Sequence, residues 1–232
     1  GVTNVVRGAD HVTNTATQIQ IIQALGGTLP SFAHHSLLTG PQGEALSKRL
    51  GTLALRDLRA QGVEPMALLS MMARLGSSDP MELRSEMAEL IELFDPVSVS
   101  RSPARFGEEE LAGLNEKLIH AMSYQSAKPK LERIEADGGE AFWTAVQPNL
   151  ATISDAKQWF SIVEGEFERA SLPEEDQTYV EQALEYLPDE PWTGNVWSEW
   201  TGRLKEATGR KGKALFMPLR LALTGLPYGP DL

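Results

Sequence analysis

The sequence predicts a mainly α-helical protein that opens with a single strand–helix unit. Three observations support this fold class. Apolar residues recur at three- and four-residue spacing through most of the chain after residue 60, which is the period of amphipathic helices. β-Branched residues gather at Val2–Val6, a run that a turn then ends. Apolar residues make up 41% of the chain and charged residues 23%, which is typical of globular proteins.

The N-terminal segment is expected to form an α/β unit. The strand around Val2–Val6 is followed by a helix that Asn14 or Thr15 would cap and Gly26–Gly27 would end. The segment Pro30–Gly43 is typical of a loop, so no parallel partner for the first strand is predicted.

The rest of the chain is predicted to be almost wholly helical, with Phe94–Phe106 as a connector that contains two prolines. The expected helices lie at about residues 65–75, 80–91, 108–122, 128–147, 154–170, 174–186, 194–208 and 213–223. Asp79 would cap the second of these. Trp197 and Trp200 share one helical face with Leu204, and we interpret this stripe as core rather than as a platform for stacking bases.

The net charge of −11 argues against a nucleic-acid partner, because such proteins usually carry net positive charge. The charge is unevenly distributed, however. Glu164–Trp200 holds 11 acidic residues and one basic residue, a balance of −10, whereas Arg203–Arg220 holds six basic residues and one acidic residue, a balance of +5. Since salt screens charges beyond about 8–10 Å, a local basic patch can still meet phosphates. A solvated helix face is the alternative interpretation of this stretch.

Several classes of protein are excluded or disfavoured by absent motifs. The chain has no cysteine, which excludes disulfides and thiolate metal sites and suits a reducing cytosol. Its four histidines form no His-x-x-x-His pair, and no phosphate-loop, dinucleotide or nucleophile-elbow motif is present. No apolar run approaches the roughly 20 residues that span a bilayer, and the N-terminus lacks a signal-peptide pattern. A cytoplasmic protein without a membrane partner or a structural metal is therefore expected.

One stretch, Pro41–Gly51, combines cations, a hydroxyl and flanking glycines. Ser47, Lys48 and Arg49 could present two positive charges and a hydroxyl to a polyphosphate, while glycines let the backbone approach the ligand. Such a tripeptide is also common in exposed basic loops, so the motif by itself leaves both interpretations open.

Together with its neighbours, this stretch resembles the Lys-Met-Ser-Lys-Ser region of class I aminoacyl-tRNA synthetases, in the Lys-Leu-Ser-Lys-Arg form of bacterial glutamyl-tRNA synthetases. The resemblance covers nearly the whole chain. Further matching segments, in order, are Val5–His11, Asn14–Gln18, Phe32–His34, Pro65–Gly76, Arg101–Phe106, Leu114–Asn115 and Pro218–Gly225. The resemblance implies the end of a Rossmann-like catalytic domain, a helical stem-contact region and an all-α anticodon-binding domain, at about residues 1–60, 61–125 and 126–232.

The resemblance also implies an activity. Glutamate and ATP, with its Mg²⁺, would form glutamyl-adenylate, and the acyl group would pass to the 3′ end of a glutamate or glutamine tRNA. Lys48, with Ser47 and Arg49, would stabilise the leaving pyrophosphate. Arg7 matches the arginine that holds the substrate carboxylate, a task that suits its planar charged fork. Asp10 and His11 match positions of the ATP and amino-acid pocket. The positions that match anticodon contacts are Arg220, Pro230 and Leu232. A monomer is expected.

The chain also departs from the family pattern. Ala45 replaces the first lysine of the signature, with Glu44 beside it, and Ala9 replaces an acidic residue. The His-x-Gly-His signature and the first half of the nucleotide-binding fold are absent. Because catalysis in this class depends on orientation and charge stabilisation by both halves, these 232 residues alone are expected to bind tRNA but not to form adenylate.

Three alternatives remain open at this point. The changes at Ala45 and Glu44 favour a non-catalytic tRNA-binding or regulatory paralogue, whereas the retained Ser47–Arg49 and Arg7 disfavour one. An enzyme that glutamylates a modified tRNA base would lack an anticodon domain, and the helices after residue 126 argue against it. A glutaminyl-tRNA synthetase would carry a β-barrel anticodon region, which these helices do not suit.

Overall fold

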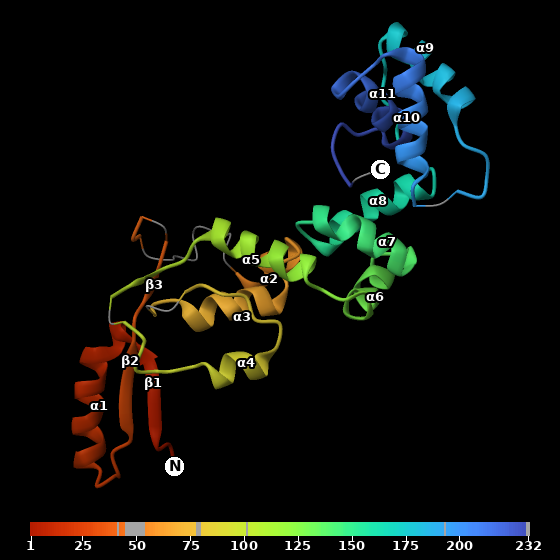
Figure 1. Cartoon of the computed structure of the whole chain (residues 1–232). Coiled ribbons are helices and arrows are strands. Elements are labelled where there is room, and N and C mark those ends of the chain that lie inside the picture. The colour runs from red at the N-terminus through yellow and green to blue at the C-terminus, as the bar shows by residue number, and fades with distance from the viewer. Residues whose placement is uncertain (41, 45–53, 78–79, 101, 193, 231–232) are drawn as a thin grey trace. The chain divides into compact units, whose positions relative to one another are not determined.

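The computed structural model of the chain describes residues 1–40, 42–44, 54–77, 80–100, 102–192 and 194–230 (Figure 1). The chain divides into two compact units, Gly1–Ala121 and Met122–Leu232. Helices dominate the described residues of both units, so the predicted mainly α fold class is confirmed.

The first unit begins with a strand–helix–strand arrangement. Strand β1 (Asn4–Gly8) leads through a short 3-10 turn into helix α1 (Val12–Ala24), and strand β2 (Ser31–His35) returns parallel to β1. The prediction that Pro30–Gly43 is a loop without a strand was therefore wrong. The burial of β2 alternates residue by residue, which is the pattern of a strand with one covered face, but its sequence has only one strongly β-forming residue, Phe32.

A second pair of short parallel strands joins distant parts of the first unit. Strand β3 (Leu38–Thr39) pairs with strand β4 (Ala104–Arg105), and Ala104 and Phe106 donate backbone hydrogen bonds to the carbonyls of Leu37 and Thr39. The segment that was expected to be a connector between helices thus also anchors the chain after β2.

Four helices complete the described part of the first unit, and their bounds are α2 Leu55–Ala60, α3 Pro65–Arg74, α4 Met87–Glu92 and α5 Glu108–His120. Helices α3 and α5 pack together, and their core includes the fully buried Met71 and the buried Leu111 and Leu114. The buried Asn115 ties the start of α3 to α5, since its side chain accepts from the Glu64 amide at 2.8 Å and donates to the Gly62 carbonyl at 3.3 Å.

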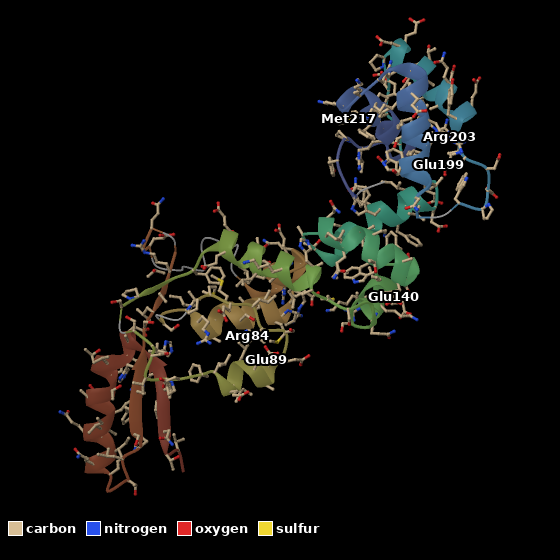
Figure 2. The ribbon with its side chains drawn as sticks, viewed as in Figure 1. Arg84, Glu89, Glu140, Glu199, Arg203 and Met217 are labelled. Carbon is tan, nitrogen blue, oxygen red and sulfur yellow. The ribbon has the colours of Figure 1, made fainter. Side chains whose placement is uncertain are left out.

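The helix predicted at residues 80–91 is shorter than expected, because α4 begins only at Met87. The Ser70 hydroxyl, buried on α3, accepts a hydrogen bond from the Arg84 amide at 3.0 Å and donates to the Arg84 carbonyl at 3.1 Å. These two bonds occupy the backbone groups that a helix would use at this residue. Figure 2 shows Arg84 on this non-helical segment and Glu89 on α4. Asp79, the expected cap, lies outside the described residues.

The second unit contains six α-helices in its described residues, and their bounds are α6 Tyr124–Arg133, α7 Gly139–Val146, α8 Ala156–Val163, α9 Glu174–Ala183, α10 Val196–Thr208 and α11 Lys213–Thr224. The single helix predicted at 128–147 is two helices, because Glu135 and Gly139 adopt positive φ angles of 57° and 84°. The helix predicted at 154–170 ends at Val163, followed by Gly165 at φ 79°.

The core between α9, α10 and α11 is built on aromatic residues with satisfied polar atoms. Trp200 is buried and donates from its indole nitrogen to the Ala183 carbonyl at 2.7 Å, and the Tyr179 hydroxyl donates to the Leu215 carbonyl at 3.0 Å. Leu204 is fully buried in the same core. The interpretation of the tryptophan stripe as core is confirmed.

Truncating this core should destabilise the second unit. We expect Leu204→Ala to lower its free energy of unfolding by about 2–5 kcal/mol, because the side chain is fully buried. Urea unfolding followed by tryptophan fluorescence measures this, since all five tryptophans lie after residue 121. The matched control, Leu184→Ala, removes a side chain that is 66% exposed and should change stability by about 0.5 kcal/mol or less. Equal effects of the two substitutions would contradict the assignment of this core.

Candidate functional site

Arg7 lies near the end of β1 and is held by neighbours from two other elements, β2 and α1. In the parallel register of the two strands Arg7 is opposite His34 on β2. Its Nη2 donates a short hydrogen bond to the hydroxyl of Thr15 on α1, and its guanidinium carbon lies 5.5 Å from the centroid of the Phe32 ring. Its Nε is buried and has no hydrogen-bond partner among the described residues. The strand pairing therefore creates a half-buried cation at the carboxyl end of parallel strands, the edge where α/β sheets bind ligands.

Thr15 connects the groups around Arg7. The side chain is buried on α1, and its hydroxyl oxygen lies 2.8 Å from Nε2 of His34 and 3.0 Å from the carbonyl oxygen of His11. Thr15 and His34 lie in segments that match the family, but no role in binding or catalysis was predicted for either residue from the sequence. The only signal in the sequence was their position. Thr15 was a candidate helix cap, and His34 follows Phe32 by two positions.

Asp10 and His11 lie in the 3-10 turn Ala9–His11, directly after β1. Both side chains are exposed, with His11 Nε2 3.8 Å from an Asp10 carboxylate oxygen. His11 Nδ1 lies 3.3 Å from the amide nitrogen of Asn14. The turn thus places two polar side chains close to Arg7 in the sequence. His11 contacts the Thr15 hydroxyl through its backbone carbonyl rather than through its side chain.

The basic loop can be followed only in part. Ala45, Ser47, Lys48 and Arg49 lie outside the described residues. Glu44 is described: its carboxylate accepts from the Gln42 amide at 3.0 Å, and its carbonyl accepts from the Gly40 amide at 2.8 Å. The carboxylate thus folds back onto the turn that leads into the loop.

Arg220 and Pro230, two of the expected anticodon contacts, are brought together in the second unit. Arg220 lies on α11, and its Nη2 donates to the Pro230 carbonyl at 2.8 Å. Its Nη1 is buried without a hydrogen-bond partner among the described residues. Leu232 lies outside the described residues. Arg220 therefore holds the segment after α11 through the bond from its Nη2 to the Pro230 carbonyl.

Two cations of the basic stretch are neutralised by nearby carboxylates. Arg203 pairs with Glu199 one turn earlier on α10, as Figure 2 shows. Arg210 pairs with Asp176 at 2.6 Å and with Glu175 at 3.1 Å, and its guanidinium lies 4.2 Å from the centroid of the Tyr179 ring. Burial raises the pKa of the Tyr179 hydroxyl above its ordinary value, against the opposing charge of Arg210.

Two searches of the described residues bear on other kinds of site. No three histidine, aspartate or glutamate side chains gather there in a way that could hold a metal ion. No helix in this part of the chain is both long and apolar enough to cross a bilayer.

Comparison with protein families identifies the chain. Residues 1–113 match the catalytic domain of the class I tRNA synthetases for glutamate and glutamine (E and Q), and residues 114–232, just over half of the chain, match an anticodon binding domain. The chain belongs to the class I tRNA synthetases. Arg7, Thr15 and His34 lie in the part that matches the catalytic domain, and Arg220 lies in the part that matches the anticodon binding domain.

Individual relatives agree with this assignment. The synthetase chain is 54% identical over its whole length to glutamate–tRNA ligase 1 of Roseobacter denitrificans and 53% identical to glutamate–tRNA ligase 2 of Ruegeria sp., covering 53% of each of those proteins. A crystal structure of a glutamate tRNA ligase from Elizabethkingia meningosepticum in complex with its amino acid shares the fold, with a TM-score of 0.80 and 24% identity over 99% of this chain and 52% of that one. The chain spans about half the length of the relatives that it matches.

The anchoring role of Arg220 can be tested by hydrogen exchange. We expect Arg220→Met to speed amide exchange at Gly225 and Leu226, the hydrogen-bonded amides directly after α11, by about 10-fold, because it removes a charged hydrogen bond worth roughly 1.5 kcal/mol. Lys213→Met, an exposed substitution on the same helix, serves as the control and should leave the exchange of these amides unchanged. Equal exchange in the wild type and the Arg220 variant would show that the segment is held by other contacts.

Proposed function

We propose that the chain is the C-terminal part of a glutamate–tRNA ligase, which activates glutamate with ATP and transfers it to the 3′ end of tRNA. The observation that carries this proposal is the identity of more than 50% across the whole chain to proteins named glutamate–tRNA ligase. Many proteins have tryptophans packed between helices or a polar cluster at the end of a strand. The proposed reaction therefore rests on the similarity to the relatives and not on these structural features.

Arg7 is the proposed ligand of the glutamate carboxylate. Its half-buried guanidinium, with neighbours on β2 and α1, is a positioned cation that can form paired hydrogen bonds to a carboxylate. Asp10 and His11, exposed in the turn after β1, are the proposed lining of the adjoining ATP and amino-acid pocket. Mg²⁺ would enter with the ATP phosphates, where it neutralises their charge.

The basic loop is the proposed phosphate-binding element. Lys48, supported by Ser47 and Arg49, would place positive charge beside the phosphates as pyrophosphate leaves. Ala45 removes one cation of the family signature. The Glu44 carboxylate accepts a hydrogen bond from the Gln42 amide, so its negative charge lies against the turn at residues 42–44.

The second unit is the proposed site of tRNA anticodon binding, with Arg220, Pro230 and Leu232 as contacts. Support comes from the match of residues 114–232 to an anticodon binding domain and from the Arg220–Pro230 bond. We propose domains at 1–60, 61–125 and 126–232, and a protein that acts as a cytoplasmic monomer with tRNA, glutamate and ATP as partners.

A non-catalytic tRNA-binding paralogue is the second candidate, because Ala45 and Glu44 weaken the cationic signature. The deciding assay is glutamate-dependent ATP–pyrophosphate exchange, with tRNA present, by the natural full-length protein that contains this chain. Exchange followed by transfer of labelled glutamate to tRNA supports the ligase. Binding of tRNA without either reaction supports the paralogue.

The polypeptide of residues 1–232 by itself should bind tRNA without catalysing exchange, because adenylate formation needs both parts of a nucleotide site. Gel-shift titration and exchange assays measure the two properties. Binding should weaken with added salt, with a modest slope that reflects few phosphate contacts. Exchange at the rate of the full-length protein, or binding that is insensitive to salt, would contradict this expectation.

Substitution of Lys48 tests the basic loop in the full-length protein. We expect Lys48→Ala to slow exchange by about 10²–10³-fold, which is the usual effect of removing a group that stabilises transition-state charge. Lys157→Ala, an exposed lysine on α8, is the matched control and should keep the wild-type rate. Ala45→Lys restores the family cation and should raise the rate. A Lys48→Ala protein with unchanged exchange would remove the loop from catalysis.

A further inference from the structure

The Thr15 hydroxyl has three polar neighbours, and their chemistry determines every hydrogen bond that it makes. A hydroxyl donates one hydrogen and accepts at two lone pairs. Arg7 Nη2 can only donate, so it occupies one lone pair, and the His11 carbonyl at 3.0 Å can only accept, so it takes the hydrogen. All three contacts are satisfied together only if Nε2 of His34, which lies 2.8 Å from the hydroxyl oxygen, donates to the remaining lone pair. His34 therefore carries a hydrogen on Nε2, and the hydroxyl is fully used.

This arrangement restrains the Arg7 guanidinium from two directions. The hydroxyl holds Nη2, and the Phe32 ring lies beside the guanidinium at 5.5 Å. The hydroxyl itself cannot turn away, because the His11 carbonyl and His34 occupy its other bonds. Thr15 is buried on α1, so the support comes from a rigid element rather than from a loop.

We propose that Thr15, backed by His34, is a positioning residue that orients Arg7 toward the carboxylate of glutamate. The inference rests on the proposed function and adds the two residues that set the direction of the cation. An arginine that is already oriented loses less conformational freedom when it binds a carboxylate, so the benefit appears in the binding of glutamate. The binding of ATP, which Arg7 is not proposed to contact, gains nothing from it.

The test uses the natural full-length protein that contains this chain, with exchange measured at varied glutamate and at varied ATP. We expect Thr15→Val, which keeps the branched shape but lacks the hydroxyl, to raise KM for glutamate by about 10-fold while KM for ATP and kcat stay within about twofold. Thr15→Ser restores the hydroxyl and should return KM for glutamate to within about threefold of the wild type. Thr17→Val, an exposed threonine on the same helix, is the control.

His34 gives an independent pair of variants in case Thr15→Val does not fold. Gln has a side-chain NH₂ donor and should preserve the bond to Thr15, so His34→Gln should stay near the wild-type KM, whereas His34→Leu should resemble Thr15→Val. A merely structural role would instead lower the fraction of active protein and leave KM unchanged.

The outcomes separate the inference from the function on which it rests. An active wild type whose Thr15→Val and His34→Leu variants keep the wild-type KM for glutamate overturns the positioning role and leaves the ligase assignment standing. A failure of Thr15→Ser to restore KM overturns the role as well. A full-length wild type without glutamate-dependent exchange overturns the proposed function, and the positioning role with it.

Discussion

The parallel register of β1 and β2 is the constraint on which the candidate site depends. It sets Arg7 opposite His34, and the helix that connects the two strands brings Thr15 to both. Side chains alternate between the faces of a strand, so a slip by one residue would turn Arg7 and His34 to opposite faces. The Thr15 hydroxyl makes such a slip costly, because it would leave a buried polar atom without its partners. Fold and site thus stabilise each other here.

The fold was predictable where local signals and tertiary packing agree. Helices α3, α5, α10 and α11 lie close to their predicted ranges, because prolines, glycines and apolar spacing mark their ends and faces. The misses have tertiary or backbone causes. Ser70 uses the backbone groups of Arg84, Glu135 takes a positive φ, and β2 is a strand because β1 lies beside it rather than because its residues favour one.

The candidate site was predictable only through its resemblance to a family. From the sequence alone, Arg7 could equally form a salt bridge at the strand end. In the structure, Arg7 has no carboxylate partner among the described residues, and its guanidinium is bound to the Thr15 hydroxyl with Nε left without a partner. The proposed roles of Thr15 and His34 could not be inferred from the sequence, since 19 positions separate them and they meet only when α1 folds between the paired strands β1 and β2. Lys48, the other principal residue, lies outside the described residues and stays a prediction from the signature motif.

The charge pattern also changes meaning once the chain is folded. The acidic and basic stretches are separate in the sequence but partly neutralise each other in space, since Arg210 pairs with Glu175 and Asp176. Arg203 is likewise paired with Glu199. Among the described residues, Lys205, Lys211 and Lys213 make no such pair within 4.0 Å, so the cationic surface is smaller than the count of +5 suggests. Few free cations in this stretch can release few counterions, so the proposed recognition of tRNA would rest more on shape and specific contacts than on the charge of this stretch.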